Sequence, residues 1–236
     1  MSGSGLYFRQ LLSGQDFAVG DRVATQMVNF AYLIGDEESR EAVVVDPAYA
    51  PDDLLDVLEA DGMRLTGVLA THHHPDHVGG TMMGFDLDGL TGLLARTPVP
   101  VHVQKPEAEW VTKVTGLSVA DLTLHENDDV VQVGDIPIRL LHTPGHTPGS
   151  QCFLVDGRLV AGDTLFLQGC GRTDFPGGDV EAMYRSVQRL GSLAGNPIVY
   201  PGHRYSEEPH SPLLDVRRSN VVFRPRSAEE FVLAFG

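Results

Sequence analysis

The chain has 236 residues and a formal net charge of −15 at pH 7. This length can bury a full core, so we expect a single domain over residues 1–236. The acidic charge repels phosphate backbones and disfavours nucleic acid as a partner. No apolar run reaches membrane-spanning length and the start lacks a signal-peptide pattern, so we expect a cytoplasmic protein without a membrane partner. Cys152 and Cys170 are too few for a disulfide framework and are expected to be free thiols.

The first half of the chain alternates short predicted strands with one clear helix. Apolar runs rich in β-branched residues predict strands at residues 6–11, 28–35, 41–48 and 66–71. Residues 51–62 predict a helix, because a proline stands near the start, acids follow it, and leucines recur at helical spacing. Residues 82–97 are rich in Gly and Leu. We expect them to form a wall or lid over a cleft, with an ordinary helix or a subunit contact as equal alternatives.

The second half repeats this theme. Residues 99–104 and 197–203 predict strands, and two hairpins are predicted around Gly134-Asp135 and Asp156-Gly157. Residues 179–193 place five apolar side chains on one helical face, and residues 227–235 open with capping-box spacing. Strand runs interspersed twice with helices indicate two sheets packed together with helices outside.

A dense histidine cluster stands between a predicted strand and a pair of glycines, in LATHHHPDHVGG at residues 69–80. Its place deep inside the chain excludes a purification tag. Side chains two apart in an extended segment share a face, so His72 and His74 point one way and His73 the other. His73 is therefore not expected to be a ligand. Pro75 then turns the chain, which places Asp76 and His77 in the first turn of a helix.

Three further polar residues follow apolar strands and lie beside glycine: His146, Asp163 and His203. A lone strand-end histidine is more often a packing residue than a ligand. The joint pattern differs, because imidazoles and carboxylates gather at a buried point only when something neutralises them. The resulting seven side chains could hold two metal ions if Asp163 bridges them, and a donor set without thiolate suits zinc, iron or manganese. The histidines outside this pattern are interpreted as structural; they are His102, His125, His142 and His210.

The motifs THHHPDH, TPGHTPGS, GDTLF and PGH together resemble those of the metallo-β-lactamase superfamily. The resemblance implies an α+β fold, an αββα sandwich of two mixed sheets with helices outside. It implies two divalent ions, with zinc expected and iron or manganese as alternatives. One ion would be held by His72, His74 and His146, and the other by Asp76, His77 and His203, with Asp163 bridging. We assign Asp76 a catalytic role in addition to metal binding.

Within the superfamily, GCGRTDFPGGD at residues 169–179 is similar to hydroxyacylglutathione hydrolases (glyoxalase type two) and to persulfide dioxygenases. The first resemblance implies hydrolysis of a small thioester by a hydroxide held between the metals. The alternative is oxidation of a persulfide with oxygen, by one iron held by His72, His146 and Asp163. A mere binding module is the third class, and it would be expected to have lost ligands. None is lost.

The substrate side is less defined. Larger glyoxalase-type enzymes carry a helical C-terminal domain that binds glutathione, but only 33 residues follow His203, so no separate substrate domain is expected. Arg172 and Tyr205 are the candidate substrate-binding residues. An ion pair that holds the loop through Arg172 and Asp174 is an equal interpretation. The expected partner is a small-molecule thioester or thiol-derived substrate, and a homo-oligomer is compatible with the sequence.

Overall fold

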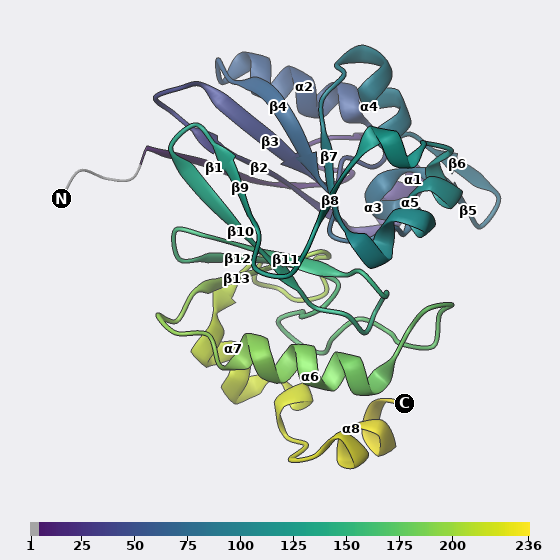
Figure 1. Ribbon diagram of the computed structural model, residues 1–236, viewed down its shortest axis with the longest axis vertical. Coiled ribbons are helices and arrows are strands. Elements are labelled where there is room, and N and C mark those ends of the chain that lie inside the picture. Colours follow the sequence, from purple (N-terminus) through teal and green to yellow (C-terminus); the bar gives the residue numbers. More distant parts are fainter. Residues whose placement is uncertain (1–4) are drawn as a thin grey trace.

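Two six-stranded sheets pack face to face in the computed structural model, which describes residues 5–236 (Figure 1). The first has the order β1-β2-β3-β4-β7-β8 and the second β14-β13-β12-β11-β10-β9. The strands of the first sheet are β1 (Leu6–Leu12), β2 (Phe30–Asp36), β3 (Glu41–Val45), β4 (Arg64–Leu69), β7 (Val101–Gln104) and β8 (Leu122–His125). Those of the second are β9 (Val130–Val133), β10 (Ile136–His142), β11 (Gln151–Val155), β12 (Arg158–Gly162), β13 (Ile198–Pro201) and β14 (Ser211–Pro212). Residues 1–4, part of the segment in which we looked for a signal peptide, lie outside the described residues.

Helices cover the outer faces of both sheets, so the predicted αββα sandwich is confirmed (Figure 1). On the side of the first sheet lie α1 (Arg22–Met27), α2 (Pro51–Ala60), α3 (Pro75–Val78), α4 (Leu90–Arg96) and α5 (Ala108–Thr115). On the side of the second sheet lie α6 (Val180–Gly191), α7 (Leu213–Ser219) and α8 (Ala228–Phe235). The described part of the chain also contains three single turns of 3-10 helix: η1 (Lys105–Glu107), η2 (Val119–Asp121) and η3 (Val221–Phe223). No helix within residues 5–236 is long and apolar enough to cross a membrane.

The core has three apolar layers, and strand β2 shows how the sequence builds them. Phe30, Tyr32 and Ile34 belong to the layer between the two sheets. Ala31 and Leu33 face the layer beneath α2 and α4. Successive side chains of a strand point to opposite faces, so a strand that is apolar throughout is buried on both sides. The third layer lies between the second sheet and α6, α7 and α8.

The segment 82–97 divides into two parts. A hairpin of β5 (Gly80–Met82) and β6 (Phe85–Leu87) is followed by α4. Met82 and Met83 line the main cavity, so this end forms part of its wall. Leu90 and Leu93 are fully buried in the core layer between α4 and the first sheet. A lid that extends over the whole segment is therefore wrong, and α4 is the ordinary helix of the alternative.

Several loops meet at one edge of the sandwich. Strands β12 and β13 are parallel neighbours, so their carboxyl ends lie together and bring Asp163 close to His203. Strand β4 ends just before His72, and His146 lies in the turn between β10 and β11. An isolated bridge also joins His203 to Asn29 ahead of β2. The two sheets thus deliver polar side chains to one shared point.

Candidate metal centre

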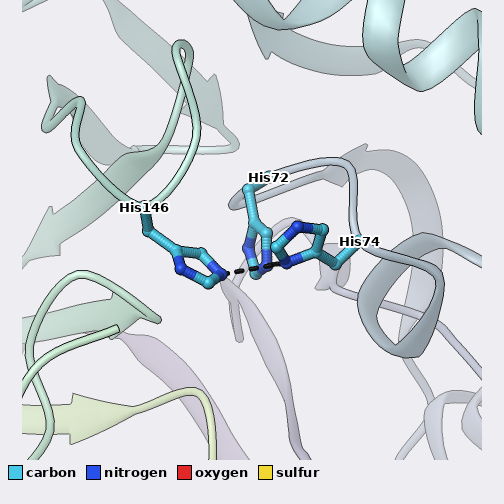
Figure 2. A group of neighbouring side chains, drawn as sticks. All are labelled: His72, His74 and His146. Atoms are coloured by element: carbon cyan, nitrogen blue, oxygen red, sulfur yellow. Dashed lines mark hydrogen bonds between the residues drawn. The ribbon is translucent and has the colours of Figure 1, made fainter. Parts of the chain in front are cut away.

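The first predicted ligand set comes together as three imidazoles, shown in Figure 2. Nδ1 of His74 lies 3.1 Å from Nε2 of His72 and 2.9 Å from Nε2 of His146. His72 and His146 are buried. Three ring nitrogens that converge on one point present lone pairs to a common centre, which is the arrangement that a divalent ion such as zinc requires.

The second predicted set lies beside the first. Nε2 of His203 is 3.4 Å from Oδ2 of Asp76 and 3.3 Å from Nε2 of His77. Short helix α3 begins at Pro75, as expected, and so aims Asp76 and His77 back over the end of β4. All three side chains are buried. The amide of Asn29 donates to Oδ2 of Asp76 at 3.2 Å and holds this carboxylate in place.

Asp163 lies between the two sets. Its carboxylate is 3.7 Å from Nε2 of His146 in the first set, and 3.5 Å and 3.3 Å from Nε2 of His77 and His203 in the second. Among residues 5–236, its buried Oδ1 atom has no hydrogen-bond partner. A side chain at Gly202 would collide with this oxygen, so only glycine permits the close approach. A buried carboxylate oxygen without a donor is costly in an apolar interior, and a cation beside it would remove that cost.

Hydrogen bonds on the outer sides of the rings define how the imidazoles face inward. Nδ1 of His146 lies 2.6 Å from the carbonyl oxygen of Arg172, and Nδ1 of His203 lies 2.8 Å from that of Met27. A carbonyl only accepts, so Nδ1 carries the proton in both rings. Each Nε2 atom therefore faces the centre and is the ring nitrogen that can offer a lone pair to a metal.

Asp46 supports both sets, and it was missed in the sequence. Its carboxylate accepts from Nδ1 of His77 at 2.8 Å and from the hydroxyl of Thr71 at 2.6 Å. The Thr71 oxygen lies 2.9 Å from Nδ1 of His72. Asp46 stands just after β3 with a φ of 54°, in the left-handed region that aspartate tolerates. Its place at a strand end was the same signal that identified the ligands.

The electrostatics of the cluster also favour a cation. Burial, together with the neighbouring imidazoles, lowers the pKa of His72 well below its ordinary value and that of His74 to about 3. Both rings are therefore neutral and free to bind a metal at physiological pH. Burial would lower the pKa of His77 too, but the carboxylates of Asp163, Asp76 and Asp46 outweigh it and raise the pKa to about 10. The three carboxylates thus favour positive charge at this point of the site.

His73 points away from the centre, as the alternation predicted. Its Nδ1 atom donates to Oε1 of Glu107 at 2.6 Å, and its ring stacks on Trp110 with centroids 4.9 Å apart. Glu107 is buried and also accepts from the hydroxyl of Thr147 and the backbone N–H of Gly149. This carboxylate thereby ties the histidine segment to the loop that carries His146. Neither Glu107 nor Trp110 was identified in the sequence.

A cavity of about 810 Å³ opens over the cluster. Its wall is mostly apolar or aromatic and includes Met82, Met83, Trp110, Val114, Phe166 and Phe175. Both candidate substrate-binding residues, Arg172 and Tyr205, line it as well. Two hydrogen bonds of 2.9 and 2.6 Å also join Arg172 to Asp174. Arg172 therefore both lines the cavity and forms the ion pair within its loop.

The two cysteines and the four histidines interpreted as structural lie outside the candidate ligand sets. Cys170 lines the cavity, and burial raises its thiol pKa to about 12; Cys152 is buried in the core, and neither is disulfide-bonded. The four histidines interpreted as structural do not join any of the candidate metal-binding groups within residues 5–236. His102 and His125, for example, pair with each other at 2.8 Å on neighbouring strands.

Comparison with known proteins agrees with this fold and site. The sequence model of the metallo-beta-lactamase superfamily matches residues 24–203, and the chain belongs to that superfamily. It is 35% identical over 217 residues to the human mitochondrial persulfide dioxygenase ETHE1, covering 88% of this chain and 76% of that protein. It is 33% identical over 209 residues to a hydroxyacylglutathione hydrolase of Tolumonas auensis, covering 88% and 73% respectively.

A solved structure gives the same result for the fold. The crystal structure of ETHE1 from Myxococcus xanthus superposes with a TM-score of 0.77 at 32% identity, covering 97% of this chain and 89% of that one. The suspected branch, with both kinds of relative, is thus confirmed. The chain is a member of an enzyme superfamily and carries the histidine and aspartate cluster of a metal centre.

Proposed function

We propose that the protein is a metal-dependent hydrolase that cleaves a small thioester. The observation that carries the proposal is the completeness of both ligand sets, with Asp163 between them. His72, His74 and His146 would hold one ion, and Asp76, His77 and His203 the other. Two divalent ions would supply a hydroxide near neutral pH and positive charge beside the developing oxyanion. Zinc suits this donor set, and iron and manganese suit it as well.

The chain's own groups have defined tasks in this reaction. Asp76 is our candidate catalytic residue, because its carboxylate lines the cavity and the amide of Asn29 holds it in place. It can accept the proton of the attacking water in addition to binding metal. The thiol of Cys170 does not compete as a nucleophile, since burial raises its pKa to about 12 and keeps it protonated. The apolar wall limits bulk water around the scissile bond.

A thioester fits a site with these groups. Its leaving thiolate has a conjugate acid with a pKa of roughly 8.5, so it departs near neutral pH without a strong general acid. The phenol of Tyr205 lines the cavity, and burial together with Asp163 and Asp76 raises its pKa above the ordinary value. It can donate a hydrogen bond to the substrate, but it is not a strong acid. The leaving groups of esters and amides are more basic than a thiolate and gain more from a general acid.

Persulfide oxidation is the second candidate, and the 35% identity to human persulfide dioxygenase supports it. One iron on His72, His146 and Asp163 would form the two-histidine, one-carboxylate set of such oxygenases. That reaction would leave His203 outside the metal set. The two functions therefore make different demands on the second ligand set.

Substitution of one ligand from each set separates them. His203→Ala should lower thioester hydrolysis by at least roughly 10- to 100-fold, because it removes a ligand of the second ion. The same change should leave most oxygen uptake on a persulfide intact. His146→Ala is the control, since its loss should abolish either activity. Metal content measured on the same samples should fall from two ions per chain to one in His203→Ala. Near-normal thioester hydrolysis by His203→Ala, with loss in His146→Ala, would refute two-metal hydrolysis.

A further inference from the structure

We propose that Lys113 is an anion-binding residue of the substrate cavity and that the substrate is a thioester with a carboxylate remote from the scissile bond. This inference rests on the proposed hydrolase function and names its substrate class. The chain contains only two lysines, Lys105 and Lys113, beside fifteen arginines. Lys105 pairs with Glu126 at 2.5 Å on the surface. Lys113 is also exposed, but it lines the cavity.

Aromatic contacts connect Lys113 to the candidate metal centre. Its Nζ atom lies 5.8 Å from the centroid of the Trp110 ring. That ring stacks on His73 at an interplanar angle of 25°, and His73 in turn contacts His74 at 4.9 Å. Lys113 is thus three ring contacts away from a metal ligand. This places its charge at a distance from the scissile bond but within the same cavity.

Lys113 and Arg172 are the two cationic side chains of Lys and Arg that line the cavity, and they differ in whether a carboxylate neutralises them. Arg172 is neutralised by two hydrogen bonds to Asp174, and its guanidinium lies over Phe175 at 4.6 Å. Within residues 5–236, no carboxylate lies within ion-pair distance of Lys113, although Glu109 stands one turn earlier on α5. In a protein of net charge −15, a cation without a partner in a cavity is an attractive point for an anion.

The cavity wall indicates which chemical groups the rest of the ligand carries. Met82, Val114 and Trp110 contribute apolar groups to the wall of the same cavity. A carboxylate carried on a short methylene chain matches a cavity that combines a cation with an apolar wall. A thioester can bind with either end toward Lys113. The carboxylate therefore belongs either to the acyl group or to the thiol carrier. The shared chemistry is an anionic end on a thioester.

Steady-state kinetics with three model thioesters test the proposal. S-acetyl-N-acetylcysteamine is neutral, S-acetyl-3-mercaptopropionate has an anionic thiol, and S-adipoyl-N-acetylcysteamine has an anionic acyl group. Lys113→Met should raise KM about 3- to 10-fold for at least one anionic substrate and less than 2-fold for the neutral one, with kcat unchanged. Lys113→Arg should restore binding. Lys105→Met is the matched control and should change nothing.

Salt dependence and NMR provide readouts that do not depend on substitution. Raising the salt concentration should increase KM for the preferred anionic substrate in the wild type, and not in Lys113→Met. Reductive methylation with ¹³C-formaldehyde labels both lysines in the metal-replete protein. The Lys113 resonance should shift on titration with 3-mercaptopropionate or adipate, according to which end carries the anion, and the Lys105 resonance should not. Butanethiol and butanol are the neutral controls.

The outcomes separate the two proposals. If no model thioester is hydrolysed, the proposed function fails, and the NMR titration still decides whether Lys113 binds carboxylates. If the wild type hydrolyses thioesters but Lys113→Met affects all three equally, the anionic substrate class is wrong. An unshifted Lys113 resonance with both carboxylates would likewise overturn the inference.

Discussion

Nδ1 of His77 donates a hydrogen bond to Oδ2 of Asp46 at 2.8 Å, and neither group is exposed to solvent. The same carboxylate reaches His72 through the hydroxyl of Thr71. One residue that binds no metal in our assignment thus orients one imidazole from each ligand set. The negative charge of Asp46 also makes both imidazoles more basic, and therefore stronger ligands for a metal ion.

Asp46→Asn should therefore weaken metal binding by about 10- to 100-fold while the fold is retained. The neutral amide keeps the shape but cannot accept from both His77 and Thr71 as strongly as a carboxylate does. Competition titration with a chromophoric chelator measures the affinity, and circular dichroism checks the fold. Asp215→Asn, on the exposed side of α7, is the control. Equal affinities for all three proteins would show that Asp46 does not support the centre.

Glu107→Gln should destabilise the protein by about 2–4 kcal/mol. The buried carboxylate accepts from Nδ1 and the backbone N–H of His73, from the hydroxyl of Thr147 and from the backbone N–H of Gly149. An amide can satisfy only part of this set, and its NH₂ group is left facing donors. Urea unfolding measures the loss. Glu126→Gln removes an exposed ion pair and should change the free energy of unfolding by less than about 1 kcal/mol.

His102 should make stability depend on pH. Burial and the adjacent His125 lower the pKa of His102 to about 4. The unfolded chain, with a pKa near 6.5, then binds more protons between these values, so this stability is present above pH 6.5 and lost as pH falls toward 4. When the pH falls from 7.5 to 5.0, the free energy of unfolding of the wild type should decrease by about 2 kcal/mol more than that of His102→Gln. Urea unfolding at both pH values checks it, and identical losses would contradict the shift.

The two parts of segment 80–97 should respond differently to truncation. Met83 is 87% exposed at the cavity edge, so Met83→Ala should alter KM for thioesters with apolar acyl groups and leave stability within about 0.5 kcal/mol. Leu90 is fully buried, and Leu90→Ala should cost about 2–5 kcal/mol. Thermal unfolding and steady-state kinetics on both variants measure this difference. A strongly destabilised Met83→Ala would place the turn in the core.

Local pattern was enough to locate the candidate ligands. Five of the seven lie in the loops that follow strands, and Asp76 and His77 lie in the short helix α3 that comes soon after β4. Strand ends can be read from short apolar runs bounded by glycine and proline. Alternation along the extended segment also predicted that His73 faces away from His72 and His74, as its contacts with Glu107 and Trp110 show.

Helix α5 shows where local pattern was insufficient. Its start has no side-chain cap, and its second half is rich in β-branched residues of modest helix propensity. Burial of Ala108 and Val111 against the first sheet stabilises it as a helix. Trp110 and Lys113 then reach the cavity only because this helix packs there, and no signal in the sequence announced it.

The sequence alone determined the two-sheet architecture and the candidate metal-binding residues, because strand periodicity and strand-end chemistry are properties of short segments. Only the tertiary structure decided which side chains support and surround them. Asp46 is 31 residues from His77, and Glu107 is 34 residues from His73. Such partners meet through the packing of separate strands and helices, and hydrogen bonds between groups that far apart in the chain have no periodicity to reveal them.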